Sequence, residues 1–538
     1  MQRLPVQLVL VALIGALFFL AAFHPAVLDI SNAGWLIRGS DGGENALGMH
    51  AWLHDPASLW SLRTGLLNAP EGTSLLFTDS NPLLGLLLKP FAGILPPDAQ
   101  FVGLWLLACC LLQPLFGWLL LRRHAPGQLA LWCGVVLLCA LPTWFNRYLH
   151  ANLFGHWLIL WALWNFTDKQ RAARFSAWVP PLIIAAMVHN YLLILVAAIW
   201  GSAFLERFAT LNGPVATRRR VELVGGALAI VGAVALIARW HGLGEHFAVT
   251  GSYGAFAMPL DALWNPANPG YGTILPAIPQ REGRGYEGFQ YLGLGILLML
   301  GLVAAMARRL PPPAGKEGSL RRLAWLAPAF LVLTLLAISS FPDFAGRRLP
   351  RIPPPEAITP LLDLVRASGR LFWPVAYTLV FAAILLLYRL GARQAGMALA
   401  ALLAIQAVDI IPEIGVVRQQ SADAAQHRLY VRTRDPRWAT TLAAARDVTF
   451  EPSDVTRDLA LFQELAWRAT SLGRPVRLAY TARISSRTAA RLAAEGARFA
   501  AGDLDPHRLY VLIGDAPVPA QARTRLLTLD GVRVIRPM

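Results

Sequence analysis

The sequence predicts a mainly α-helical membrane protein with many spans, followed by a small α/β domain. Of the 538 residues, 56% are apolar and only 15% are charged, whereas about a quarter of a soluble chain is charged. Long apolar runs recur up to residue 411, and shorter amphipathic and β-rich segments replace them afterwards. The formal charge of +16 is therefore no sign of a nucleic-acid partner, and we exclude that function class.

Eleven apolar runs are predicted to cross the membrane. The first lacks a small-residue cleavage site before His24-Pro25, so we interpret it as a retained helix. We divide the stretch 177–205 into two spans because Pro180, Pro181 and His189-Asn190 interrupt it, and a single tilted helix is the alternative. The predicted spans are 6–23, 101–121, 129–145, 152–166, 177–188, 191–205, 221–239, 290–307, 323–341, 371–388 and 395–411.

The basic residues between these runs predict the orientation. Clusters such as Arg122/Arg123, Arg218/Arg219/Arg220 and Arg389/Arg393 all fall on one side, which the positive-inside rule assigns to the cytoplasm. The apolar stretch 82–95 is too short to span and would invert every later loop, so we expect an interfacial or re-entrant helix there. We expect a multi-pass protein of a bacterial inner membrane, in contact with membrane lipid, with a cytoplasmic N-terminus and a periplasmic C-terminal part.

The last part of the chain is predicted to form one small α/β domain. Segments 475–480, 508–514 and 531–537 have the composition of strands, and 455–472 and 485–499 have the pattern of helices. No glycine-rich phosphate loop follows these strands, which argues against a nucleotide site. The predicted domains are a transmembrane domain, 1–411, with a first periplasmic loop at 24–100, and a periplasmic domain, 412–538.

Three outer segments, 24–100, 240–289 and 342–370, place polar side chains directly beside membrane helices. Ionisable groups at the membrane border are costly unless they face a cavity or one another, so these segments predict a polar chamber at the outer leaflet. There a carboxylate can accept the proton of an acceptor hydroxyl, and an arginine fork can hold a departing phosphate. The pattern favours transfer from a lipid-phosphate-linked donor to a hydroxyl group.

Five short motifs carry a family resemblance. They are FTDSNPL (77–83), Lys89-Pro90, FVGLW (101–105), YEGFQYLG (286–293) and RASGRLFWP (366–374). These motifs resemble a bacterial family of GT-C type, and the order of spans, acidic first loop and outer domain resembles the GT-C superfamily of membrane glycosyltransferases. The resemblance implies a GT-C helix bundle, a polyprenyl-phosphate-linked sugar donor, inversion at the anomeric carbon and a catalytic acid in the first outer loop.

By position, the catalytic acid implied by the resemblance is Asp41. The family pattern places the acid directly after the glycine, whereas this chain reads Gly39-Ser40-Asp41, so Glu44 remains a competitor. Capping of the following helix is the alternative role of Asp41, and a first-turn position favoured by the helix dipole is that of Glu44.

The remaining candidates are binding residues. Arg366, Arg370 and Lys89 are predicted to bind the donor phosphate, with membrane-border snorkelling as the alternative for the arginines. The substrate-binding candidates are Asp79, His189, Glu287 and Tyr286, where a turn, a satisfied buried histidine or a loop anchor are the alternatives. Arg147, Tyr148, His150 and His156 flank an outer turn and are interpreted as an ordinary interfacial belt, with contact to sugar or phosphate as the alternative.

The sequence thus predicts a glycosyltransferase acting on a periplasmic acceptor, a glycan or lipid-linked molecule such as lipopolysaccharide or exopolysaccharide. No cofactor is expected to be required; a divalent metal is compatible with such a site but is not indicated, and no zinc spacing occurs among the four cysteines. The rival classes are a lipid-linked polysaccharide polymerase or ligase, a transporter or flippase of lipid-linked sugars, and a glycan-binding subunit without catalysis.

Overall fold

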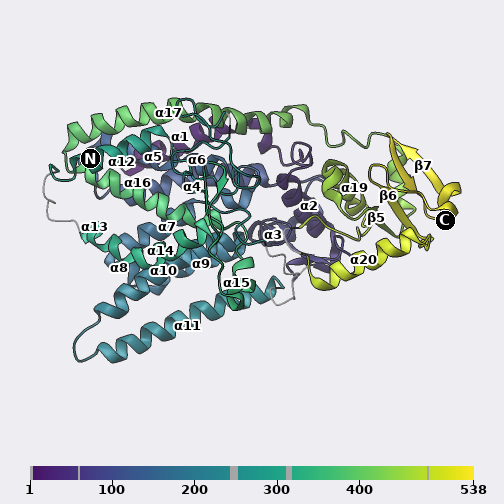
Figure 1. The fold of residues 1–538 in the computed structure, drawn as a ribbon, viewed down its shortest axis with the longest axis horizontal. Helices are drawn as coiled ribbons and strands as arrows, with labels where there is room; N and C mark the ends of the chain where they lie inside the picture. Colours follow the sequence, from purple (N-terminus) through teal and green to yellow (C-terminus); the bar gives the residue numbers. More distant parts are fainter. Residues whose placement is uncertain (1–3, 59–60, 243–251, 269, 311–317, 482–483) are drawn as a thin grey trace.

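The computed structural model describes residues 4–58, 61–242, 252–268, 270–310, 318–481 and 484–538. The chain is mainly helical, with a helix bundle at one end of the long axis and a small sheet with its helices at the other (Figure 1). The first outer loop, drawn in purple with α2 (Asp41–His54) and α3 (Pro82–Leu88), lies between these two parts (Figure 1).

Seven helices of the described residues are long and apolar enough to cross a membrane, which makes the chain a membrane protein. The other four predicted spans contain shorter helices, which are α5 (Gln128–Cys139), α7 (Trp157–Thr167), α9 (Phe175–Val188) and α12 (Leu294–Met306). The seven long stretches are α1 (Leu4–Ala22), α4 (Val102–Leu121), α10 (Asn190–Thr210), α11 (Ala216–Trp240), Leu320–Ile338 with α14 (Ala327–Ile338), Ser368–Tyr388 with α16 (Trp373–Tyr388), and Ala392–Gln426 with α17 (Ala392–Ala422).

The boundaries of several helices follow from single residues. His189 separates α9 from α10 with an extended backbone, and its ring nitrogen accepts a hydrogen bond from the Tyr191 amide, so the stretch 177–205 is two helices. The last predicted span does not end at 411, because α17 continues through Pro412 to Ala422. The stretch 82–95 forms α3 and a short 3-10 turn that expose Leu87, Phe91 and Ile94.

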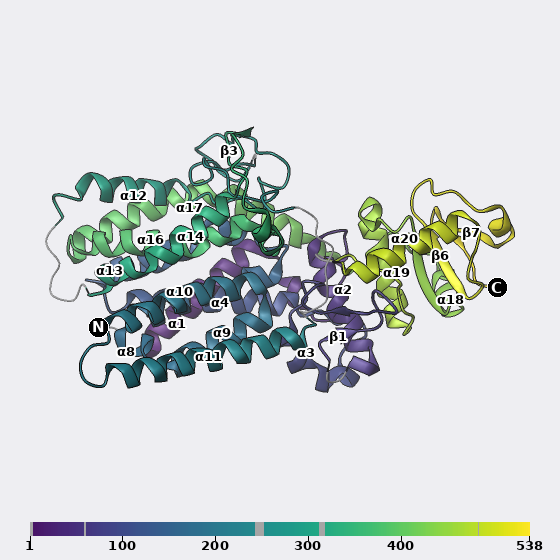
Figure 2. The ribbon, with the colours of Figure 1, turned by 60° about the horizontal axis from the view of Figure 1, so that its bottom comes forward.

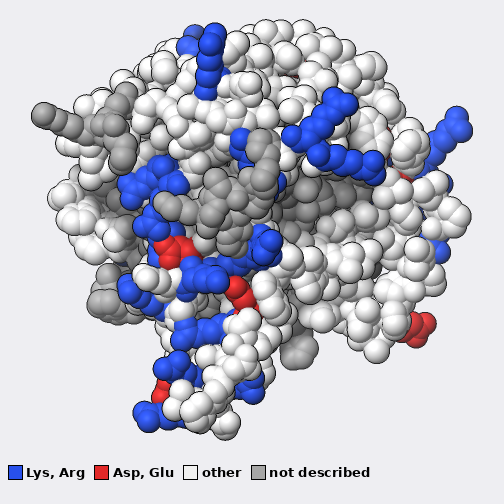
Figure 3. All heavy atoms as spheres, turned by 90° about the vertical axis from the view of Figure 1, so that its left-hand side faces the viewer, with Lys and Arg blue, Asp and Glu red and all other residues white. Residues whose placement is uncertain are grey.

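The long helices run side by side along the bundle, and α11 lies on its outside, where it packs against α9 (Figure 2). Lysine and arginine side chains gather on the end of the bundle away from the C-terminal sheet (Figure 3). Shorter helices and two-stranded hairpins lie in the segments between the longer helices. They are α6 (Pro142–Phe145), α8 (Lys169–Ala172), α13 (Gly318–Leu323), α15 (Thr359–Asp363), β1 (Arg63–Thr64) with β2 (Thr73–Ser74), and β3 (Asp343–Phe344) with β4 (Arg347–Arg348).

The C-terminal part is a four-stranded sheet of order β5-β6-β8-β7. Strand β6 pairs in parallel with β5 and antiparallel with β8, and β8 and β7 form a hairpin closed by Asp530-Gly531, both with positive φ. Its elements are α18 (Arg437–Ala443), β5 (Asp447–Glu451), α19 (Leu459–Ser471), α20 (Ser486–Ala500), β6 (Arg508–Leu512), β7 (Leu526–Leu529) and β8 (Val532–Ile535).

The predicted strand 475–480 is realised only as isolated bridges at Val476, one to Val448 of β5 and one to Leu67 of the first outer loop. The Val476 amide donates to the Leu66 carbonyl at 2.8 Å, and the Ala69 amide donates back to the Val476 carbonyl at 3.0 Å. The first outer loop is therefore hydrogen-bonded to the edge of the C-terminal sheet.

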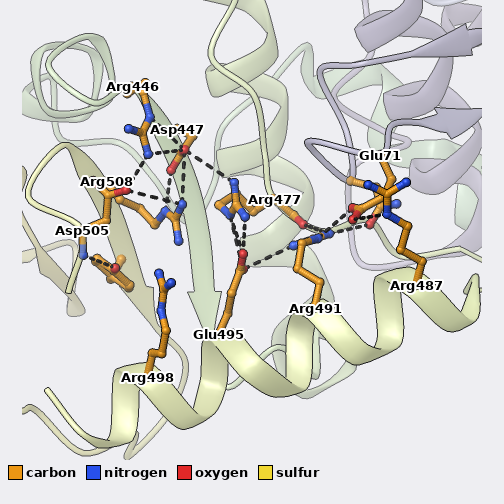
Figure 4. Close-up of polar contacts among 12 residues, drawn as sticks. Glu71, Arg446, Asp447, Arg477, Arg487, Arg491, Glu495, Arg498, Asp505 and Arg508 are labelled. Carbon is orange, nitrogen blue, oxygen red and sulfur yellow. Dashed lines mark hydrogen bonds and ion pairs between the residues drawn. The ribbon is translucent and has the colours of Figure 1, made fainter. Parts of the chain in front are cut away.

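Ion pairs reinforce this contact between the loop and the C-terminal part (Figure 4). Glu71 of the loop forms an ion pair with Arg491 of α20 at 2.7 Å. Arg491 also contacts Glu495, and Glu495 forms a further ion pair with Arg477. Helix α19 adds Gln463, whose side chain accepts from the Gly39 amide at 2.8 Å and donates to the Ser40 carbonyl at 2.7 Å. The C-terminal part thus holds the chain directly before Asp41.

Candidate functional site

Asp41 is the first residue of α2, at the border between the bundle and the C-terminal part. Ser40, not Asp41, occupies the N-cap position. The Asp41 carboxylate lies 3.4 Å from His150 Nε2 and accepts a hydrogen bond from the Tyr480 hydroxyl at 3.3 Å. Because 27% of its side chain remains exposed, Asp41 is both held in place and accessible.

His150 lies at the centre of a group of carboxylates. It follows α6 in the chain, and its ring contacts Asp79 Oδ2 at 3.1 Å, Glu287 Oε1 at 3.2 Å and Asp41. Burial by itself lowers the pKa of His150, but the hydrogen bonds to Asp79 and Glu287 outweigh burial and raise the pKa to about 9. The imidazole is therefore a cation at neutral pH.

Asp79 connects His150 to a second histidine. Its Oδ1 lies 3.2 Å from His189 Nε2, at the break between α9 and α10. Burial alone raises the pKa of the Asp79 carboxyl, but the hydrogen bonds from His150 and His189 outweigh it and hold the pKa below its ordinary value. Asp79 has a φ of +54°, a conformation that non-glycine residues rarely adopt and that is often found at functional sites.

A close backbone approach brings the Asp79 loop onto α2. A Cβ at Gly48 would lie 2.1 Å from Thr78 Oγ1 and 2.4 Å from Ser80 Oγ, so a larger residue there would push the loop away. Asn152 secures the loop from the other side by donating to the Asp79 carbonyl at 2.8 Å. The residue of this motif that caps α3 is Asn81, whose side-chain oxygen accepts a hydrogen bond from the Leu84 amide at 3.2 Å. Asp79 does not cap the helix and instead contacts His150 and His189.

Glu287 forms ion pairs with two arginines, Arg147 and Arg370. Arg147 contacts it at 2.7 Å and Arg370 donates from Nε at 2.8 Å and from a terminal nitrogen. Burial acts to raise the pKa of Glu287, but the charges of Arg370 and Arg147 outweigh it and keep the pKa well below its ordinary value. The Tyr286 ring lies 4.4 Å from the Arg147 guanidinium.

A second close approach fixes the position of Glu287. A Cβ at Gly369 would lie 2.8 Å from the Gly288 Cα and 2.9 Å from the Glu287 carbonyl oxygen. Gln290 closes the contact by donating to the Gly369 carbonyl at 2.7 Å. The YEGFQ and RASGR motifs are therefore packed directly on each other, and this brings Arg370 to Glu287.

Glu44 follows Asp41 in the first turn of α2, and Arg366 is close enough for its charge to act on Glu44; neither forms an ion pair with the groups described above. Glu44 is buried, its Oε1 has no hydrogen-bond partner among the described residues, and burial, followed by the charges of Asp79 and Asp41, raises its pKa well above the ordinary value. Arg366 is half-buried and packs 5.2 Å from the Phe256 ring. Arg366 forms no ion pair within the described ranges, but its positive charge acts to lower the pKa values of Glu44 and Tyr480.

Lys89 is the predicted site residue that the structure does not bring to this cluster. Its ammonium donates to the carbonyls of Trp52 and Asp55 at the end of α2 and to Ser58 Oγ at 2.8 Å, and it lies 4.7 Å from the Trp52 ring. These contacts satisfy the last carbonyls of the helix, which is a structural role.

The cluster also contains residues that the sequence patterns did not single out as site residues. Arg147 and His150 appeared as members of an interfacial belt, yet they pair with Glu287 and with all three carboxylates respectively. The sequence feature that could have identified them is their position in an outer turn between two predicted spans, on the same side as the other candidates. Tyr480 carried no signal, because its contact with Asp41 exists only through the docking of the C-terminal part.

The arrangement combines an accessible carboxylate, a histidine cation, a buried acid with a raised pKa and an arginine, Arg366, that forms no ion pair with the residues the structure describes. It is chemically suited to accept a proton at Asp41 and to neutralise negative charge at Arg366. Among the described residues, no group of three or more histidine, cysteine, aspartate or glutamate side chains is arranged to hold a metal ion. The expectation that no cofactor is required stays a prediction.

Two family models match this chain, one over most of the transmembrane part and one over most of the C-terminal part. A family described as "Domain of unknown function (DUF6311)" matches residues 12–411, and the "DUF6311 C-terminal domain" matches residues 437–537. No curated protein matches the chain. Because the first match covers well over half of the residues, the chain belongs to the DUF6311 family.

Proposed function

We propose that this protein is a membrane glycosyltransferase that moves a sugar from a polyprenyl-phosphate-linked donor to the hydroxyl of an acceptor on the outer side of the membrane. The observation that carries the proposal is that two groups occur in the same region: Asp41, a partly exposed carboxylate held by His150 and Tyr480, and Arg366, whose guanidinium has no ion pair among the described residues and whose charge acts on Glu44 and Tyr480. A base for the acceptor and a cation for the leaving phosphate thus lie at one site.

In the proposed reaction, Asp41 accepts the proton of the acceptor hydroxyl while that oxygen forms a bond to the anomeric carbon. The bond between the anomeric carbon and the phosphate oxygen breaks, and the phosphate leaves with the electron pair. Arg366 neutralises the charge that develops on the phosphate. Inversion at the anomeric carbon and a GT-C mode of action are what the resemblance of the outer-loop motifs implies.

The roles of the acids and arginines follow from their partners. Asp41 is a better placed base than Glu44, because Asp41 is partly exposed, whereas Glu44 is buried and burial raises its pKa well above the ordinary value and so favours the protonated carboxyl. Arg366 is a better phosphate ligand than Arg370, whose donors are already directed to Glu287. We assign Arg370 to positioning Glu287, and through it His150.

We place the protein in the inner membrane of a bacterium, with the basic end of the bundle in the cytoplasm and the C-terminal part in the periplasm. The acceptor would then be a periplasmic glycan or lipid-linked molecule. A phosphatase reporter fused after residue 436 should be active, and a reporter in the loop at residue 213 should be inactive. Activity at residue 213 and none after residue 436 would reverse the orientation.

The direct test uses purified protein in lipid nanodiscs with a synthetic polyprenyl-phosphate sugar. The wild-type protein should release polyprenyl phosphate when an acceptor glycan is added, and Asp41→Asn should lower the rate at least about a hundredfold while donor binding is retained. Asp29→Asn removes a partly exposed acid of the same loop and is the matched control, which should leave the rate unchanged. Donor binding without release of the carrier, in the presence of varied acceptors, would instead favour a flippase.

A further inference from the structure

A cavity of about 1160 Å³ lies at the basic end of the bundle, remote from the cluster around Asp41. It surrounds the C-terminal end of α4 and is bordered by α1, the start of α5 and the segment where α7 meets α8. Figure 3 shows this end of the molecule, where lysine and arginine side chains gather on the surface. The proposed reaction does not use this cavity.

The cavity has an apolar wall and a cationic rim. Leu119, Leu120 and Leu131 belong to its lining, and so do Arg122, Arg123 and Arg171, which lie at or beside the ends of helices. Among the described lining residues, Asp168 is the one acid, so the lining carries three cations against one anion. An apolar wall beneath a cationic rim complements a molecule with an apolar tail and an anionic head.

The single acid does not neutralise the rim. Asp168 contacts Arg123 at 2.6 Å and Arg171 at 3.0 Å, and it also accepts hydrogen bonds from the backbone amides of residues 170 and 171. Arg122 has no ion pair among the described residues, and its guanidinium lies 4.4 Å from the Trp118 ring. Three arginines and one aspartate give the described lining a net charge of +2, and Arg122 is the cation of the three that has no ion pair there.

Two tryptophans orient these cations. Arg122 lies over Trp118 and Arg171 lies over Trp164 at 4.0 Å, so each guanidinium is stacked by its face. Arg171 also contacts Asp168 and donates to the Trp164 carbonyl at 2.8 Å, so it contributes its charge from a fixed position, and Arg122 supplies the guanidinium without an ion pair among the described residues. Helix α4 ends at Leu121, one residue before Arg122, and tryptophans and arginines at the end of a spanning helix lie at the level of the lipid headgroups.

We propose that this cavity is a binding site for an anionic phospholipid of the leaflet at the basic end, with the lipid phosphate held between Arg122 and Arg171 and an acyl chain along the leucine wall. The site is independent of the proposed glycosyl transfer. Its ligand is identified by chemistry: a phosphate with an attached apolar chain, rather than a soluble anion, fills both halves of the cavity.

The test measures lipid binding to the purified full chain by native mass spectrometry, after delipidation, with phosphatidylglycerol, phosphatidylcholine and inorganic phosphate as probes. The wild-type protein should bind phosphatidylglycerol at least about tenfold more tightly than phosphatidylcholine. The double variant Arg122→Gln/Arg171→Gln should lose that preference. The matched control Arg218→Gln/Arg219→Gln removes two exposed arginines of α11 at the same end, outside the cavity, and should keep it.

The double variant could lose its lipid preference simply by misfolding, so a second variant tests the charge of the cavity with both arginines in place. Thr167→Glu places a negative charge on the cavity lining without removing either arginine, and it should weaken phosphatidylglycerol binding while leaving phosphatidylcholine binding unchanged. Equal binding of the two lipids by the wild-type protein would overturn the proposal. So would an equal loss of preference in the α11 control, or full displacement of the lipid by inorganic phosphate at the same concentration.

Discussion

The Nε2 atom of His150 lies 3.4 Å from Oδ2 of Asp41, and the same ring reaches Asp79 through Nδ1 at 3.1 Å. One histidine therefore joins the first outer loop at two places, from a turn between two membrane helices. Asp79 in turn contacts His189 at 3.2 Å. The proposed base thus lies at the end of a chain of alternating carboxylates and imidazoles, and its position depends on the charge of His150.

Replacement of His150 by glutamine should change how the transfer rate depends on pH. In the wild-type protein, the rate should fall as the pH rises through about 9, because His150 loses the proton that pairs it with Asp41. The His150→Gln variant should be at least about tenfold slower at pH 7 and should lack that decline. His427→Gln, which removes an exposed histidine paired with Asp29 at 3.6 Å, should retain the wild-type profile.

The stability of the protein should also depend on His150. The pKa of this residue is raised from 6.5 to about 9 in the folded protein, so its stabilising contribution is complete below about pH 6.5 and is lost as the pH rises through 9. The free energy of unfolding should fall by at most about 3 kcal/mol over this interval. Thermal unfolding in detergent would measure it, and an equally steep fall in His150→Gln would contradict this origin.

Arg366→Ala should weaken the donor interaction. Charge-assisted contacts to a phosphate contribute about 1.5–3 kcal/mol, so KM for the donor should rise roughly 10- to 100-fold. Because Arg366 has no ion pair among the described residues, the thermal stability of the variant should remain close to that of the wild type. The measurement is a donor titration in the release assay. An unchanged KM would place the phosphate elsewhere.

Arg370→Ala should act mainly on stability. Arg370 and Glu287 are both largely buried, and removing one partner of a buried ion pair costs about 3 kcal/mol. Thermal unfolding should show this loss even without any substrate. Arg370→Lys should recover only part of it, because a lysine cannot reproduce the two contacts of the guanidinium with Glu287. Full stability in Arg370→Ala would show that Arg147 alone suffices to hold Glu287.

The contact between the first loop and α20 offers a matched pair of variants (Figure 4). Arg491 lies 2.7 Å from Glu71 and is largely buried, so Arg491→Gln should lower the free energy of unfolding by about 2 kcal/mol and speed hydrogen exchange in the loop. Arg487 lies 3.9 Å from the same carboxylate with 85% of its side chain exposed, so Arg487→Gln should have almost no effect. Equal effects would indicate that the contact depends on charge alone.

Parts of the fold were predictable because they depend on local sequence. The apolar runs and the break at His189-Asn190 gave the helices, and the helices α19 and α20 and the strands β6 and β8 lie where their patterns indicated. Strands β5 and β7 were not predicted, and 475–480 proved to be a set of isolated bridges. Both β5 and β7 are edge strands of the sheet. Whether a segment forms an edge strand depends on the neighbouring strand that the rest of the fold supplies, and local composition does not predict that neighbour.

The candidate site was only partly predictable for the same reason. The motifs around Asp41, Asp79, Glu287 and Arg370 were recognisable, because each places ionisable groups beside an apolar helix. Their mutual contacts were not, and Lys89 shows the consequence: its motif is equally conspicuous, yet its ammonium caps α2. A motif indicates that a residue has a role, and its neighbours in space decide which role.

The sequence by itself determined that this is a membrane protein with its basic residues gathered between spans, because hydrophobicity and charge are properties of each segment alone. The tertiary structure decided which ionisable groups meet. Close backbone contacts at Gly48 and Gly369 bring the loops of Asp79 and Glu287 to His150, and the docked C-terminal part adds Tyr480 to Asp41. Distances of about 3 Å between groups hundreds of residues apart are set by packing, and packing involves the whole chain.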